Sequence, residues 1–330
     1  MKAFLDYDVK YPDLVLYVIR FFCMRSDGQS DRSIGQFCSQ FKVHEGEMPL
    51  QPTVMVSICD RLCEMRKMVC TKREGPMGLN NAYYSRPQDA ELAKKHPDIL
   101  QHHLNSYVYS FEYIYRHYKE RTLPLIVHNE EGDEMGSCFR IYDGIATARH
   151  CLPDRCSISI RGYSGAKLSS CPVFVSKDPS VDLAFIKTGE SWFYNSAEPR
   201  VLDNVLVMGY PRIPFFQDFC TAERASISSM AEIKLTPTRG AIVAEGQIYY
   251  PRNHPKMLLI TARIRGGNSG GPVINESGYV VGVATGAPSG EGYSDDNLGY
   301  GMAYPISVLE EVIKEQNNIQ VQFADFPDYD

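Results

Sequence analysis

The segment Arg265–Pro272 constrains the fold of this chain more than any other feature. It places four glycines, an asparagine and a serine between two apolar runs, Met257–Ile260 and Tyr279–Val283. Runs of that length and composition are typical of buried β-strands. Glycine reaches backbone conformations that other residues rarely adopt, so the segment predicts a sharp turn between two strands. Similar short runs, separated by Gly and Pro, continue from about residue 121 and predict an all-β region.

Ser269 lies inside this turn, where its hydroxyl can act as a nucleophile. Hydrolysis by an activated hydroxyl also needs N–H donors aimed at the oxyanion that develops. We expect the backbone N–H groups of Gly267 and Ser269 to supply them. Gly270 and Gly271 are expected to let a substrate backbone approach closely.

A nucleophilic serine needs a base, and two other segments offer one with its partner. A predicted strand that begins at Gly144 ends in His150, and Asp182 lies in the predicted strand Val181–Lys187. An imidazole can take the serine proton, and a buried carboxylate can hold the imidazole in the required tautomer. The sequence therefore predicts a catalytic triad of His150, Asp182 and Ser269.

These three segments, in the order His, Asp, Ser, resemble trypsin-like serine peptidases, and especially the HtrA type. The resemblance implies an all-β double-barrel peptidase domain over residues 121–318. It implies a serine endopeptidase that cleaves protein or peptide substrates through an acyl-enzyme, with no metal and no cofactor. A peptide-binding pseudoprotease is the alternative, which an intact triad disfavours.

The resemblance also implies a specificity pocket. Arg263 stands six residues before Ser269, a position that lies at the base of the pocket in this family. A buried guanidinium there favours cleavage after Asp or Glu, unless Arg263 pairs with a carboxylate of the protein or points away. The expected walls are Ala284, Thr285, Gly286 and Gly301.

Activation is expected to differ from that of trypsin. Asn268 offers no carboxylate for a newly cut N-terminus, and no IVGG-like start occurs near Leu123–His128. We hypothesise that an N-terminal domain senses a partner and controls the peptidase.

The first 98 residues resemble a winged helix-turn-helix domain, so the predicted fold class of the whole chain is multidomain α+β. Three apolar patterns with helical spacing precede a turn-rich segment flanked by two short strand patterns. The helical positions are Leu14, Val15, Val18, Ile19 and Phe22, then Ile34, Phe37, Cys38 and Phe41 after the expected cap Asp31, then Met55, Ile58, Cys59 and Leu62. The expected hairpin pairs Met68–Thr71 with Ala82–Tyr84.

Residues 99–120 are predicted to form a connecting amphipathic helix. Its apolar stripe alternates steps of four and three residues and consists of Leu100, Leu104, Tyr107, Phe111, Ile114 and Tyr118. The stripe either packs on its own domain or forms a homodimer, and the sequence does not decide between them.

Charge bears on the partner of the N-terminal domain. Residues 1–120 carry 16 basic and 15 acidic side chains, and the third predicted helix mixes Arg61, Arg66 and Lys67 with Asp60 and Glu64. Nucleic-acid binding needs clustered positive charge. We therefore favour a regulatory protein partner over a DNA-binding regulator that carries a protease.

The remaining features bear on location and metals. No apolar run reaches the roughly 20 residues of a membrane span, and Met1–Lys10 does not read as a secretory signal. We therefore expect a cytoplasmic protein with no membrane partner, whose ten cysteines are mostly reduced. A zinc site on Cys59, Cys63 and Cys70 is disfavoured by their spacing. Residues 319–330 are expected to form an acidic tail.

Overall fold

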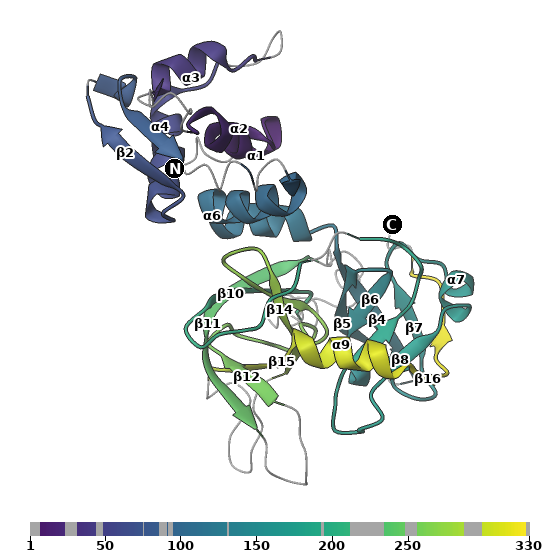
Figure 1. Ribbon diagram of the computed structural model, residues 1–330. Coiled ribbons are helices and arrows are strands. Elements are labelled where there is room, and N and C mark those ends of the chain that lie inside the picture. Colours follow the sequence, from purple (N-terminus) through teal and green to yellow (C-terminus); the bar gives the residue numbers. More distant parts are fainter. Residues whose placement is uncertain are drawn as a thin grey trace, which may run out of the picture. The chain divides into compact units, whose positions relative to one another are not determined.

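The computed structural model describes residues 7–23, 32–43, 49–74, 76–85, 91, 95–130, 132–192, 195–211, 234–247, 256–286 and 299–327. They belong to two compact units, Met1–Ile114 and Tyr115–Asp330 (Figure 1). Among the described residues, no helix is both long and apolar enough to cross a membrane.

The N-terminal unit combines helices with one small sheet. Its helices are α1 (Tyr7–Lys10), α2 (Leu14–Phe21), α3 (Ile34–Gln40) and α4 (Pro52–Glu64). Its strands, β1 (Arg32–Ser33), β2 (Met68–Lys72) and β3 (Ala82–Ser85), form an antiparallel sheet in the order β1-β3-β2, with the 3₁₀ turn η2 (Pro76–Gly78) between β2 and β3. The three helices and the hairpin therefore occur where the apolar spacing places them.

The start of α3 differs from the expectation. Ser33 caps the helix, accepting a hydrogen bond from the Gln36 N–H, while the Ser33 N–H donates to the Gln36 side chain at 2.9 Å. This reciprocal pair satisfies two donors at the helix start. The predicted cap, Asp31, lies outside the described residues.

The connecting helix is α6 (Pro97–Tyr118), which is interrupted at Ser110, where the backbone φ is +62°. Leu100 and Leu104 lie in the hydrophobic core of the N-terminal unit together with residues of α2 and α4. At these two positions the stripe packs on its own unit. The homodimer stays a prediction.

One half of the second unit is a closed six-stranded barrel with the order β10-β11-β12-β15-β14-β13 (Figure 1). Its strands are β10 (Asn204–Gly209), β11 (Thr236–Gln247), β12 (Lys256–Ile260), β13 (Pro272–Asn275), β14 (Val280–Gly286) and β15 (Gly301–Pro305). The glycine-rich segment connects β12 to β13. The first flanking run, Met257–Ile260, lies in β12 as expected, but the second, Tyr279–Val283, falls largely in β14, so the strand directly after the turn is one that the flanking runs do not predict. The barrel interior is apolar, with Val207, Ile260 and Val281 all fully buried.

The other half is an eight-stranded sheet with the order β16-β8-β9-β6-β5-β4-β7-β17. Its strands are β4 (Thr122–Asn129), β5 (Gly132–Ile141), β6 (Gly144–Thr147), β7 (Ser157–Ile160), β8 (Val173–Val175), β9 (Ala184–Ile186), β16 (Asn317–Ile319) and β17 (Gln322–Phe323). Two short helical elements, η3 (Arg149–Cys151) and α7 (Gly165–Ser169), lie between its strands.

This sheet corrects the expectation of two closed barrels. The sheet is open, with β16 at one edge and β17 at the other. Strand β16 pairs with β8, and strand β17 pairs with β7. Both edge strands follow helix α9 (Ile306–Glu315), which comes directly after β15 of the barrel. Residues 319–323, expected in an acidic tail, therefore lie partly in strands that complete the sheet.

Cysteines and metal-ligating groups in the described ranges form neither disulfides nor metal clusters. Nine cysteines are free thiols there, and no group of three or more His, Cys, Asp or Glu side chains could hold a metal. Burial raises the pKa of the Cys63 thiol to about 11 and that of Cys59 well above its ordinary value.

The tight packing around Gly144 predicts that a larger side chain there lowers the free energy of unfolding. A Cβ at this position would lie 2.3 Å from the Ile186 carbonyl oxygen and 2.3 Å from the Phe185 ring. Overpacking of this kind costs about 1–3 kcal/mol, so Gly144→Ala should lower the free energy of unfolding by that amount in urea titrations. Gly246→Ala is the control, because nothing lies within 4 Å of its Cβ position. Equal midpoints for the two variants would contradict the packing of β6 on β9.

Candidate active site

His150 and Asp182 meet because their strands are neighbours. Strands β6 and β9 pair antiparallel with Thr147 opposite Ala184, so the residues after β6 and those before β9 lie at the same edge. His150 lies in the turn η3 rather than at the end of a strand, and Asp182 lies two residues before β9. Asp182 Oδ2 is 2.6 Å from His150 Nδ1, and Asp182 Oδ1 accepts the His150 backbone N–H at 2.8 Å.

The carboxylate fixes the imidazole in two ways. Its two oxygens bind the ring and the backbone of the same residue, which sets the ring orientation and favours the tautomer with the proton on Nδ1. The hydrogen bond to Asp182, with a smaller contribution from the Cys151 side chain, raises the pKa of His150 from 6.5 to about 10 against the opposing effect of burial. The pair therefore stabilises an imidazolium.

Ser269 is nearly buried, but its hydroxyl does not bind the imidazole. Ser269 Oγ donates to the backbone carbonyl of Thr285 at 2.6 Å, and the described structure contains no hydrogen bond between Ser269 Oγ and His150. The structure thus pairs the predicted base with its carboxylate and holds the predicted nucleophile on a carbonyl of β14. Transfer of the serine proton to His150 requires Oγ to leave Thr285.

The glycines of the turn are needed by the protein itself. Gly267 and Gly270 have φ of +98° and +85°, in the region that favours glycine. A Cβ at Gly270 would lie 2.1 Å from the Ser137 carbonyl oxygen, and one at Gly271 would lie 2.1 Å from the Met208 carbonyl oxygen. Close packing within the chain therefore requires glycine at both positions, and the role of Gly270 and Gly271 in the approach of substrate stays a prediction.

The backbone N–H groups of Gly267 and Ser269 donate no hydrogen bond to any part of the chain that the structure describes. Both residues are buried, with Ser269 exposed by 8 %. Buried N–H groups normally have a partner. Two such donors beside a serine hydroxyl can receive an oxygen atom from outside the chain, which is what an oxyanion requires.

Ser137 is a site residue that the sequence does not reveal. It lies on β5 and is fully buried, and its backbone N–H donates to the Ser269 carbonyl at 2.9 Å. Its hydroxyl donates to the Gly267 carbonyl at 2.6 Å. A serine within a predicted strand gives no signal of such contacts, because they reach residues about 130 positions away in the chain.

The expected pocket residues come from neighbouring strands. Ala284 and Gly286 of β14 pair with Ala303 and Met302 of β15, and Gly301 begins β15. Thr285 is buried between them. Arg263, in the segment after β12, is exposed, so the buried guanidinium on which a strong acidic preference depends is absent. Its backbone carbonyl accepts the Thr238 hydroxyl at 3.1 Å.

Comparison with known proteins agrees with this geometry. The family model described as trypsin-like peptidase domain matches residues 136–283, a range that contains His150, Asp182 and Ser269. Residues 136–283 are therefore similar to trypsin-like peptidase domains. The expected resemblance to trypsin-like, HtrA-type peptidases is thereby confirmed for this part of the chain.

The curated relatives that match this chain are named as proteases. A probable periplasmic serine endoprotease DegP-like from Rhizobium meliloti is 30% identical over 188 residues, which cover 54% of this chain and 32% of that protein. Protease Do-like 2, chloroplastic, from Arabidopsis thaliana is 26% identical over 190 residues, covering 54% of this chain and 28% of that protein. The chain thus spans about a third of the length of the curated relatives it matches.

Solved structures are also similar to the trypsin-like domain. The Rv3671c protease from M. tuberculosis in its active form is 21% identical with a TM-score of 0.45, over 64% of this chain and 88% of that one. A serine endoprotease from Yersinia pestis is 21% identical with a TM-score of 0.43, over 62% of this chain and 65% of that one.

The relatives overturn one expectation. The expected cytoplasmic location is wrong, because relatives from Rhizobium meliloti, Bartonella henselae and Chlamydia trachomatis are named as periplasmic.

The contact between Asp182 and His150 predicts how the titration of His150 and the stability of the fold depend on pH. Because folding raises the pKa of His150 from 6.5 to about 10, its contribution to stability is complete below pH 6.5 and is lost as the pH rises to about 10. In a Ser269→Ala background, NMR titration should place the His150 midpoint far above 6.5. Adding Asp182→Asn should bring that midpoint back toward 6.5 and flatten the alkaline loss of stability. A His150 midpoint near 6.5 with Asp182 intact would contradict the pairing.

Proposed function

We propose that this protein is an active serine endopeptidase whose catalytic residues are His150, Asp182 and Ser269. The observation that carries the proposal is the bidentate contact of Asp182 with the ring and backbone of His150. An exposed structural histidine does not need a carboxylate in that arrangement, whereas a general base does. The family match over residues 136–283 supports the same conclusion.

The proposed reaction is acyl transfer from a peptide to Ser269. Oγ leaves the Thr285 carbonyl, gives its proton to His150 Nε2 and attacks the scissile carbonyl carbon. The imidazolium formed is stabilised by Asp182, and the oxyanion accepts the N–H groups of Gly267 and Ser269. His150 then protonates the leaving amine. Water releases the acyl group by the same steps, with His150 as its base.

The resting site is latent in this proposal. Ser269 Oγ is engaged with Thr285, and the raised pKa of His150 keeps the imidazole protonated at neutral pH. A protonated base cannot accept the serine proton. Substrate that displaces the Thr285 contact and excludes water from the pair is expected to restore a neutral imidazole and the Ser269–His150 hydrogen bond.

Replacing the nucleophile tests the proposal. Ser269→Ala should lower hydrolysis of a quenched fluorescent protein substrate by at least about a thousandfold, because no other hydroxyl can form the acyl-enzyme. It should also abolish covalent labelling by a fluorophosphonate, measured by intact mass. Ser169→Ala is the control, since Ser169 is an exposed serine in α7 of the same unit. Unchanged turnover or labelling in Ser269→Ala would refute the assignment.

For the specificity pocket we retain Arg263, Ala284, Thr285, Gly286 and Gly301. The residues of β14 and β15 are buried or half-buried neighbours, which suits the walls of a pocket. A preference for acidic residues before the cut now rests only on the positive charge of Arg263, because the side chain is exposed. Exposed ion pairs contribute about 0–1 kcal/mol, so we propose a weak preference at most.

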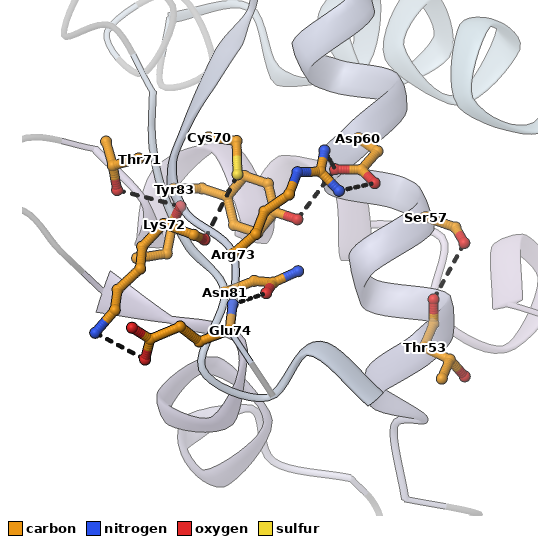
Figure 2. A network of polar contacts seen from close by, with 11 residues as sticks. Thr53, Ser57, Asp60, Cys70, Thr71, Lys72, Arg73, Glu74, Asn81 and Tyr83 are labelled. Carbon is orange, nitrogen blue, oxygen red and sulfur yellow. Dashed lines mark hydrogen bonds and ion pairs between the residues drawn. The ribbon is translucent and has the colours of Figure 1, made fainter. Parts of the chain in front are cut away.

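The N-terminal unit is proposed to be a winged helix-turn-helix-like domain that binds a regulatory protein. The order α2, β1, α3, α4, β2, β3 supports the fold assignment. On the face formed by α4 and the β2–β3 hairpin, cations are paired with acids (Figure 2). Arg73 donates two hydrogen bonds to Asp60 at 2.8 and 3.2 Å, and Lys72 lies 2.9 Å from Glu74. These two ion pairs offset part of the positive charge on this face, and phosphate binding depends on such charge.

An aromatic groove in the same unit suits a protein partner. It has a volume of about 710 Å³ and lies between α2 and α3, with Tyr11, Tyr17, Phe37 and Phe41 among its lining residues. The Phe41 ring contacts the rings of Tyr11 and Tyr17 edge-on at 5.6 and 5.8 Å. Of these side chains, Tyr17 is exposed and Phe41 is half-buried, whereas Tyr11 and Phe37 are buried. Accessible aromatic side chains such as Tyr17 are common at protein interfaces. Lys10 and Lys42 also line the groove and favour an acidic segment.

A gel-shift series tests the choice of partner. The full-length protein should bind a random-sequence DNA duplex no more tightly than about 100 μM at physiological salt, at the weak limit of non-specific binding. Lower salt should add little affinity, because Arg73 and Lys72 are already paired with acids. Tight binding that weakens steeply with salt, and is lost on Arg61→Gln with Lys67→Gln, would favour the DNA-binding alternative.

A further inference from the structure

We propose that Ser137 is a positioning residue that sets the geometry of the oxyanion-binding turn. The inference rests on the proposed function, since it concerns the N–H groups of Gly267 and Ser269. It assigns a role to a residue of the sheet that contains His150 and Asp182, although Ser137 itself makes no hydrogen bond to either of them in the described structure.

The contacts of Ser137 converge on the two residues that carry these N–H groups. Its backbone N–H donates to the Ser269 carbonyl at 2.9 Å, and its hydroxyl donates to the Gly267 carbonyl at 2.6 Å. One fully buried residue therefore holds the carbonyls on either side of Asn268. These carbonyls belong to the Gly267–Asn268 and Ser269–Gly270 peptides, which adjoin the peptides that carry the Gly267 and Ser269 N–H groups, so anchoring them restricts how those N–H groups can turn.

Such an anchor is needed because the turn is rich in glycine. Gly267 has φ of +98° and lacks the Cβ that restricts other residues, so its flanking peptides have several accessible orientations. Only some orientations aim the Gly267 and Ser269 N–H groups at one point. An oxyanion site works when its donors are fixed before the reaction, because no reorganisation is then needed in the transition state.

The direction of the Ser137 hydroxyl is itself imposed by a neighbour. The Tyr210 backbone N–H donates to Ser137 Oγ at 2.9 Å, so the single hydroxyl proton is left for the Gly267 carbonyl. Gly209 provides the space, since a Cβ there would lie 2.8 Å from Ser137 Oγ. The end of β10 thus orients Ser137, and Ser137 orients the turn.

Two isosteric variants test this role. Thr and Val have nearly the same shape, so Ser137→Thr and Ser137→Val impose the same crowding and differ in the hydroxyl. We expect kcat of Ser137→Val to be about 10–100-fold below that of Ser137→Thr, with KM within threefold, because removing one oxyanion donor outright costs about 10²–10³. Affinity for a peptidyl boronic acid, which forms a tetrahedral adduct, should fall by the same factor.

Ser159→Ala is the matched control for loss of a buried hydroxyl. Ser159 is also fully buried in this sheet, and its hydroxyl bonds His128 Nε2 at 2.9 Å. Its kcat and boronic acid affinity should stay within twofold of wild type. Ser137→Ala should lower kcat in the same way as Ser137→Val, with a stability loss similar to that of Ser159→Ala.

The outcomes separate this inference from the proposed function. Equal kcat for Ser137→Thr and Ser137→Val, or a loss confined to KM, would overturn the positioning role while leaving the peptidase intact. A wild-type protein that neither cleaves nor reacts with a fluorophosphonate would instead overturn the proposed function. Unfolding of Ser137→Val under conditions where Ser137→Thr folds would also count against the inference, because the hydroxyl would then be structural.

Discussion

The hydrogen bond from the Ser137 N–H to the Ser269 carbonyl is the contact on which the site depends. His150 and Asp182 belong to the eight-stranded sheet, whereas Ser269 belongs to the closed barrel. The three side chains can work together only if the glycine-rich turn is held against the sheet. The missing Cβ of Gly270 allows this approach, because any side chain there would collide with the Ser137 carbonyl.

The two halves of the site differ in how far they are prepared for catalysis. Asp182 already holds His150 by ring and backbone, and this contact raises the pKa of the imidazole to about 10. Ser269 instead donates to the Thr285 carbonyl. In the proposed mechanism, the Ser269 hydroxyl has to rotate away from the Thr285 carbonyl before it can give its proton to His150.

The sequence predicted the features that local pattern encodes. The β12–β13 turn, the pairing of His150 with Asp182 and the helices of the N-terminal unit all follow from apolar spacing and motif order. It failed where distant segments meet. The C-terminal strands fill the edges of an open sheet, Arg263 is exposed, and Ser137 contacts a turn about 130 residues away. Such contacts depend on how distant segments pack together. The spacing of apolar residues along the sequence predicts single helices and strands but not these contacts.

The most direct test of this account is a crystal structure of the protein with Ser269 phosphonylated by a fluorophosphonate. The account predicts that Oγ leaves the Thr285 carbonyl and that the phosphonyl oxygen lies about 2.7–3.1 Å from the N–H nitrogens of both Gly267 and Ser269. The Ser137 hydroxyl should still bond the Gly267 carbonyl. A phosphonyl oxygen directed into solvent, with the turn detached from Ser137, would contradict it.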